Sequence, residues 1–189
     1  MRYESKFYIA AVGVSAGGQE PLWNFFSHIP PNSGIIFIVI QHLSRDYDSI
    51  ADTLLAKHTT MPVCWATNHQ TVEPNCVYML PVNKTMTIEG GRLHLQDRMA
   101  DDRINRAIDM FFCSLAAGEK AHTIGIVLSG AGSDGTLGAI QIHKEHGLVM
   151  VQDPETALFP SMPRSAILKE HSTLILSPIR LAEALLDYV

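Results

Sequence analysis

The sequence predicts a three-layer α/β fold, in which a doubly wound, mostly parallel sheet has helices on both faces and carries an added β-hairpin. Short apolar runs alternate along the chain with segments of helical periodicity. The run at 34–40 (GIIFIVI) is almost uniformly apolar and β-branched, which is typical of a strand covered on both faces. The pair Gly90-Gly91 separates two segments that alternate apolar and polar residues, which indicates a hairpin.

The elements follow in order from these patterns. In the helix expected at 48–58, Ile50, Leu54 and Leu55 share one face, and Ser44, Asp46 or Asp48 is available as its N-cap. In the helix expected at 104–116, the buried side is expected to carry Ile104, Ile108, Phe111, Phe112 and Leu115. Strands are predicted at 7–14, 34–40, 62–65, 77–80, 124–128, 148–151 and 173–176, the hairpin at 85–89 and 92–96, and helices at 20–27, 48–58, 104–116, 136–146, 161–169 and 178–188.

Composition and charge exclude several classes of protein. The chain has 189 residues, of which 47% are hydrophobic and 17% are charged, so we expect a single globular domain over 1–189 and exclude a disordered, collagen-like or coiled-coil chain. The formal net charge is −5, and this lack of a basic surplus argues against nucleic acid as a partner.

The apolar runs and the cysteines indicate the compartment. The first apolar run, at 8–14, is too short for a signal peptide or a membrane span, and no later run approaches the length of a span. Cys64, Cys76 and Cys113 form no C-x-x-C pair and are interpreted as reduced thiols. We therefore expect a cytoplasmic protein that does not insert into a membrane.

Three candidate residues follow predicted strands. Ser15 lies in Gly13-Val14-Ser15-Ala16-Gly17, which fits G-x-S-x-G, a sharp turn that exposes a serine hydroxyl. His42 follows the strand at 34–40, and Asp134 lies in the glycine-rich loop 129–135. The carboxyl ends of parallel strands meet at one edge of a sheet, so these side chains are expected to lie close together.

Each residue also has a simpler interpretation. The turn at Ser15 could hold a phosphate at a helix N-terminus, with Ser15 as an ordinary cap. His42 could bond to nearby backbone, and Asp134 could be the N-cap of the next helix. His143 and His146 have the H-x-x-H spacing of metal ligands, but no carboxylate or cysteine partner is evident, so no metal is expected.

The coincidence of the three residues favours a Ser-His-Asp triad. His42 would accept the proton of Ser15 as the hydroxyl attacks a carbonyl, and Asp134 would orient the imidazole. The backbone N–H groups of Ala16 and Ala131 are the candidates for an oxyanion hole. The chain order Ser, His, Asp differs from that of the α/β-hydrolases, so the turn does not indicate membership of that family.

With these residues in hand, the sequence resembles the catalytic domain of the chemotaxis protein-glutamate methylesterases, the CheB family. Separated motifs carry the resemblance in order over nearly the whole chain. They are GVSAGG at 13–18, IQHLS at 40–44, VEPNCVYMLP at 72–81, GGRL at 90–93, IDMFFCSLA at 108–116, LSGAGSDGTLGA at 128–139 and VQDPETALFPSMPRSAI at 151–167.

The resemblance implies a cofactor-free hydrolase that removes methyl esters from glutamates of the cytoplasmic domain of chemoreceptors, and that in some members deamidates glutamine. It implies the triad Ser15, His42 and Asp134, and substrate contacts from Met162 and Arg164, although a capped helix start with a surface arginine explains those two residues equally well. About six residues precede the first predicted strand, so no receiver domain is expected. The resemblance extends to domains fused to a CheR-type methyltransferase, which makes such an enzyme an expected partner.

Two departures from receiver-bearing members lie beside the expected oxyanion hole. Many of those members have methionine at the position of Ala131 and threonine at that of Ala16, so substrate fit is expected to differ more than the reaction. Two other functions stay open: a module that binds a phosphate-containing ligand, and a scaffold or sensory domain of a signalling protein.

Overall fold

The computed structural model describes residues 7–43, 49–99, 104–119, 122–169 and 174–189. Its centre is a seven-stranded sheet with the order β3-β4-β2-β1-β7-β8-β9, and a separate two-stranded sheet pairs β5 with β6. The strands are β1 (Ile9–Val14), β2 (Ile36–Gln41), β3 (Val63–Trp65), β4 (Val77–Met79), β5 (Lys84–Glu89), β6 (Arg92–Asp97), β7 (Thr123–Val127), β8 (Leu148–Gln152) and β9 (Leu174–Leu176).

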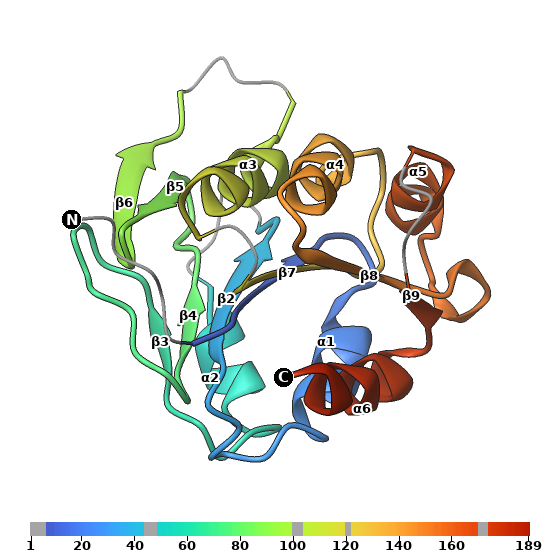
Figure 1. Cartoon of the computed structure of the whole chain (residues 1–189), viewed down its shortest axis with the longest axis horizontal. Coiled ribbons are helices and arrows are strands. Elements are labelled where there is room, and N and C mark those ends of the chain that lie inside the picture. The colour runs from blue at the N-terminus through green and yellow to red at the C-terminus, as the bar shows by residue number, and fades with distance from the viewer. Residues whose placement is uncertain (1–6, 44–48, 100–103, 120–121, 170–173) are drawn as a thin grey trace.

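The helices pack in two layers, one on each face of the large sheet. Figure 1 shows α3, α4 and α5 on one face and α1, α2 and α6 on the other. The helices are α1 (Gln19–Phe26), α2 (Ala51–Leu55), α3 (Ala107–Glu119), α4 (Thr136–Lys144), α5 (Ser161–Lys169) and α6 (Pro178–Tyr188), with a 3-10 turn η2 (Pro154–Thr156).

The sheet is doubly wound, and β1 lies at the point where the strand order reverses. β1 pairs in parallel with β2 on one side and with β7 on the other. The remaining pairings of this sheet are parallel as well. The predicted fold class is therefore confirmed, and the reversal at β1 is where ligands bind in such sheets.

Successive side chains of β2 point to opposite faces of the sheet and pack in two different cores. Ile36, Ile38 and Ile40 pack in the core beneath α3 and α4, whereas Phe37 and Val39 pack in the core beneath α1 and α6. All of these side chains are buried. A buried apolar side chain of this size contributes about 1.5–3 kcal/mol, which explains the uniformly apolar sequence of this strand.

The predicted hairpin forms where the glycine pair indicated it. Gly90 and Gly91 have φ of 56° and 70°, the positive values that a tight two-residue turn requires. The hairpin packs against α3, where the N–H of Ile88 donates to Oγ of Ser114 at 3.0 Å.

Two predicted helices are shorter at their start than expected. α3 begins at Ala107, and Oδ1 of Asn105 accepts the N–H of Ala107 at 3.1 Å. Ile104 lies before the helix with 69% of its surface exposed, so its predicted place on the buried side is wrong. The other four predicted core positions of α3 are buried: Ile108, Phe111, Phe112 and Leu115.

The helix expected at 48–58 is the single short helix α2. Ile50 is its N-cap residue and is exposed, so its predicted place on one helical face with Leu54 and Leu55 is wrong. Oγ of Ser49 accepts the N–H of Ala51 at 3.2 Å, next to the positions predicted for the cap. The predicted caps Ser44, Asp46 and Asp48 lie outside the described residues. Within the described residues, no helix combines the length and apolarity needed to cross a membrane.

Candidate active site

Three residues predicted from the sequence meet at the carboxyl edge of the sheet. Ser15 follows β1, His42 follows β2 and Asp134 lies between β7 and α4. Nδ1 of His42 lies 3.1 Å from Oγ of Ser15, and Nε2 of His42 lies 2.8 Å from Oδ2 of Asp134. The three side chains therefore form one continuous hydrogen-bonded chain.

Strand order explains which ring nitrogen faces which partner. Neighbouring strands lie about 4.8 Å apart, so the ends of β2 and β7, which flank β1, are separated by about 10 Å. The His42 side chain bridges this gap: its Nε2 contacts Asp134 and its Nδ1 faces Ser15. A carboxylate only accepts hydrogen bonds, so Nε2 donates to Asp134 and Nδ1 is left as the acceptor for the Ser15 hydroxyl.

The turn that carries Ser15 is held by its backbone. The N–H of Ser15 donates to the carbonyl of Ser129 at 3.0 Å, and the N–H of Gly18 donates to the carbonyl of Ser15 at 3.1 Å. Gly17 has a φ of 65°, which reverses the chain before α1. The N-cap of α1 is Gly18, and no side chain caps this helix, so the alternative in which Ser15 is merely a cap is wrong. Its hydroxyl is directed to His42 instead.

Gly130 allows the loop after β7 to approach Ser15 closely. A Cβ atom at Gly130 would lie 2.2 Å from Sδ of Met162 and 2.9 Å from Cβ of Ser15. No side chain fits between these two residues. Met162 has 0% of its surface exposed, so the expectation that its side chain touches a substrate is wrong. It packs behind the loop and supports Gly130.

Asp134 is held in place by the backbone of α3. Its Oδ2 accepts the N–H of Ile108 at 3.0 Å, and its Oδ1 accepts the N–H groups of Asp109 at 2.8 Å and Gly135 at 2.9 Å. A helix N-terminus favours a carboxylate because its N–H groups carry partial positive charge. Asp134 therefore stabilises the start of α3 rather than capping the following helix α4, whose N-cap is Gly135 without a side-chain bond.

Asp109, in α3, makes the reciprocal contact with the start of α4. Its Oδ1 accepts the N–H of Gly138 at 3.0 Å. Asp134 thus binds the N-terminal turn of α3, which carries Asp109, and Asp109 binds the N-terminal turn of α4, which follows Asp134. Burial raises the pKa of Asp109, and the negative charge of Asp134 nearby raises it further. Sequence reasoning did not find Asp109, because an acidic residue in the first turn of a helix is common and does not reveal which helix it contacts.

A second residue that sequence reasoning missed is Gln152, at the end of β8. It is fully buried, and its Oε1 accepts the N–H of Ser129 at 2.9 Å. Oγ of Ser129 in turn donates to the carbonyl of Ala16 at 2.9 Å and accepts the N–H of Phe159 at 3.1 Å. Through Ser129, Gln152 ties together the chain segments around Ser15. A buried glutamine at the end of an apolar strand was the available signal.

Ala16 follows Ser15 in the chain, and Ala131 follows Gly130, at which a Cβ atom would lie 2.9 Å from Cβ of Ser15. Among the residues that the structure describes, neither alanine N–H group donates a hydrogen bond to a protein acceptor. The N–H groups of Ser15, Gly130 and Gly132 beside them are all engaged. The two candidate oxyanion donors are thus available to a ligand atom.

A cavity of about 420 Å³ opens over Ser15 and His42. Arg164 does not line it; its exposed guanidinium lies 3.5 Å from the carboxylate of Glu155. Glu20 in the first turn of α1 does line it, and a carboxylate there disfavours a bound phosphate. The lining residues are Ser15, Ala16, Gly17, Gln19, Glu20, Trp23, Gln41, His42, Leu43 and Leu158.

Within the described ranges, no three His, Cys, Asp or Glu side chains form a group that could hold a metal ion. Cys64, Cys76 and Cys113 are free thiols.

The chain is similar to several known proteins. The chain is 42% identical over 116 residues to an uncharacterized 104.1 kDa protein of Rhodobacter capsulatus, in a match that covers 61% of this chain and 12% of that protein. It is 31% identical over 186 residues to a putative protein-glutamate methylesterase/protein-glutamine glutaminase of Leptospira interrogans, in a match that covers 97% of this chain and 93% of that protein. Against several longer relatives it spans about half of their length.

A solved structure and a family model extend the comparison. The crystal structure of the Thermotoga maritima CheB methylesterase catalytic domain aligns with a TM-score of 0.87 at 25% identity, and covers 98% of this chain and 100% of that domain. The model of the CheB methylesterase family matches residues 10–185. The chain belongs to the CheB methylesterase family.

Proposed function

We propose that this protein is a serine hydrolase that removes methyl groups from glutamyl γ-methyl esters in the cytoplasmic region of chemoreceptors, and that it also deamidates glutamine there. The hydrogen-bonded chain Ser15–His42–Asp134, with contacts of 3.1 and 2.8 Å, carries the proposal. The names of the relatives in the same family support the ester and amide substrates.

In the first half of the reaction, Oγ of Ser15 attacks the ester carbonyl while Nδ1 of His42 takes the hydroxyl proton. Asp134 accepts the hydrogen bond of Nε2–H and stabilises the imidazolium that forms. The C–O bond to the methoxy group then breaks, and methanol leaves with the proton from His42. A glutamyl ester of Ser15 remains.

In the second half, His42 removes a proton from a water molecule that attacks this acyl-enzyme, and Ser15 leaves with that proton. The products are a glutamate side chain and a free enzyme. The N–H groups of Ala16 and Ala131 are the proposed donors to the oxyanion in both steps, and such donors are worth about 10²–10³ in rate each. With glutamine as the substrate, ammonia leaves in place of methanol and the remaining steps are unchanged.

The partners follow from the same proposal. The protein substrate is a methylated chemoreceptor, and a CheR-type methyltransferase supplies the esters. No cofactor takes part, because attack, proton transfer and oxyanion binding are all assigned to residues of this chain. A scaffold role is disfavoured because a domain that only binds partners has no need of the aligned triad.

The test is methanol release from the methylated cytoplasmic fragment of a chemoreceptor by the wild-type chain and by the variants Ser15→Ala, His42→Ala and Asp134→Ala. We expect release by the wild type and a loss of about 10³-fold or more in the Ser15 and His42 variants. Circular dichroism of each variant verifies that it is folded.

Two results would contradict the proposal. The first is release by a folded Ser15→Ala variant at the wild-type rate, which would remove the serine from the reaction. The second is an absence of release by the folded wild type from receptor fragments that another methylesterase demethylates, which would favour the scaffold role.

A further inference from the structure

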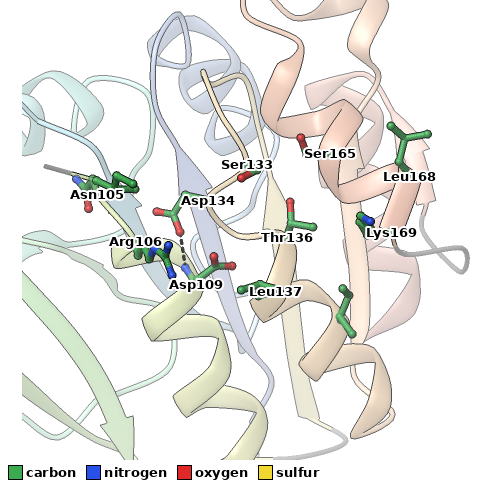
Figure 2. Close-up of a pocket in the computed structure, with 12 residues that line it drawn as sticks. Asn105, Arg106, Asp109, Ser133, Asp134, Thr136, Leu137, Ser165, Leu168 and Lys169 are labelled. Atoms are coloured by element: carbon green, nitrogen blue, oxygen red, sulfur yellow. Dashed lines mark hydrogen bonds between the residues drawn. The ribbon is translucent and has the colours of Figure 1, made fainter.

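A second and larger cavity, of about 710 Å³, lies next to the candidate active site. His42 lines the cavity over Ser15, and its hydrogen-bond partner Asp134 lines this second cavity. Figure 2 shows Thr136 and Leu137 of α4 between residues from the start of α3 and residues of α5. We call this cavity the α4 groove; its apolar side chains are Ile104, Leu137, Ile140 and Leu168, and its basic ones are Arg106 and Lys169.

The apolar part of the α4 groove is unusually exposed. Ile104, in the segment before α3, Leu137 of α4 and Leu168 of α5 have 69%, 57% and 73% of their surfaces accessible. Large apolar side chains that gather around a groove on a folded domain mark an interaction site. At the floor of the groove, the hydroxyl of Thr136 is buried and has no hydrogen-bond partner among the described residues.

The charged side chains of the α4 groove are positive at the rim. Arg106 and Lys169 are exposed, and neither forms an ion pair with another residue that the structure describes. The two carboxylates of the groove are already engaged: Asp134 binds His42 and backbone N–H groups, and Asp109 binds the backbone of α4. The rim therefore has cations available for carboxylates of a partner.

We propose that the α4 groove docks an acidic amphipathic helix of the methyl-accepting protein substrate. Apolar side chains on one face of that helix would cover Ile104, Leu137 and Leu168, and carboxylates beside them would pair with Arg106 and Lys169. The inference rests on the proposed function, because a protein that accepts methyl groups on glutamates carries carboxylates, which are the partners that these cations would pair with. The groove adjoins the triad, so a helix in it presents neighbouring residues to Ser15.

The test compares two substrates that use the same catalytic residues. One is the methylated cytoplasmic fragment of a chemoreceptor, and the other is the methyl ester of a single blocked glutamate, which is too small to reach α5. Lys169→Glu and Leu168→Gln are expected to lower kcat/KM for the receptor fragment about tenfold, mainly through KM, and to leave the small ester within about twofold. Both residues are exposed, so the fold tolerates the changes.

Matched variants control for charge. Lys57→Glu makes the same charge change just after α2, on the opposite face of the sheet, and is expected to leave both substrates unaffected. Lys169→Arg keeps the charge at the rim and is expected to retain activity toward the receptor fragment. In the Ser15→Ala background, the dissociation constant of the methylated fragment, measured by fluorescence anisotropy, is expected to rise about tenfold with Lys169→Glu.

The outcomes separate the two proposals. If Lys169→Glu and Leu168→Gln match the wild type on the receptor fragment, or slow both substrates equally, the α4 groove is not the docking site and the esterase proposal stands. If the wild type hydrolyses neither ester, the proposed function fails and this inference fails with it.

Discussion

The loop after β1 and the loop after β7 are both glycine-rich and meet at the same edge of the sheet, yet they hold their candidate catalytic side chains in opposite ways. In the first loop the backbone is held, by the bond from the N–H of Ser15 to the carbonyl of Ser129 at 3.0 Å, and the hydroxyl contacts His42. In the second loop the carboxylate itself is held, because Asp134 accepts N–H groups from Ile108, Asp109 and Gly135.

The difference follows from what each group would do in the proposed reaction. A nucleophile has to give up its proton and form a new bond, so its side chain cannot also be a structural partner. The carboxylate has to keep one orientation while the charge of His42 changes, and fixed backbone donors supply that without reorganisation. The side chain of Ser15 can thus be replaced without loss of stability, because the backbone of its loop is held independently. The side chain of Asp134, in contrast, stabilises the start of α3.

The largest expected effect comes from replacing Ser15 and Asp134 in two separate variants. Ser15→Ala should abolish ester hydrolysis and change the free energy of unfolding by no more than about 0.5 kcal/mol. Asp134→Asn should lower kcat about 10⁴-fold and also destabilise the protein by about 1–3 kcal/mol, because it weakens the bonds to the start of α3. Urea unfolding and methanol release measure the two quantities. Equal stability of both variants would contradict the difference between the two loops, because Asp134 would then not stabilise the start of α3.

A smaller effect is expected at the contact between the two loops. Gly130→Ala brings a methyl group against Sδ of Met162 and Cβ of Ser15, so we expect a loss of about 1–3 kcal/mol in stability together with a lower kcat. Adding Met162→Ala removes the contact with sulfur but not the one with Ser15. The loss of melting temperature caused by Gly130→Ala should therefore be smaller when it is measured against Met162→Ala than when it is measured against the wild type. The kcat of the double variant should stay low. Recovery of kcat as well would show that Ser15 is not displaced.

The smallest expected effect is a pH-dependent change in stability caused by Asp109, which joins α3 to α4. The pKa of Asp109 is raised in the folded protein, so the stability that its protonated form contributes is complete below the pKa of the unfolded chain. That contribution is lost as the pH rises through the raised folded pKa. The stability of Asp109→Asn relative to the wild type should therefore increase with pH across this interval and then level off. Urea unfolding over an acid-to-neutral pH series measures it, and parallel curves would contradict it.

Much of the fold was predictable because it depends on local patterns. The apolar run of β2 requires burial on both faces, and Gly90-Gly91 permits the tight turn of the hairpin. Ser15, His42 and Asp134 were predictable for a related reason: each follows a strand, and parallel strands bring their carboxyl ends to one edge. Sequence order alone thus determined which three side chains could meet.

Tertiary structure decided how these side chains are held. The contacts of Asp109 with α4 and of Gln152 with Ser129 join segments far apart in the chain, and no periodicity encodes such pairs. The resemblance implied that Met162 contacts a substrate, whereas in the structure its side chain is buried against Gly130. The α4 groove exists because the segment before α3 and the helices α4 and α5 leave apolar side chains uncovered at one place. Local sequence determines which conformation a segment prefers, whereas burial and partners depend on what the rest of the chain brings beside it.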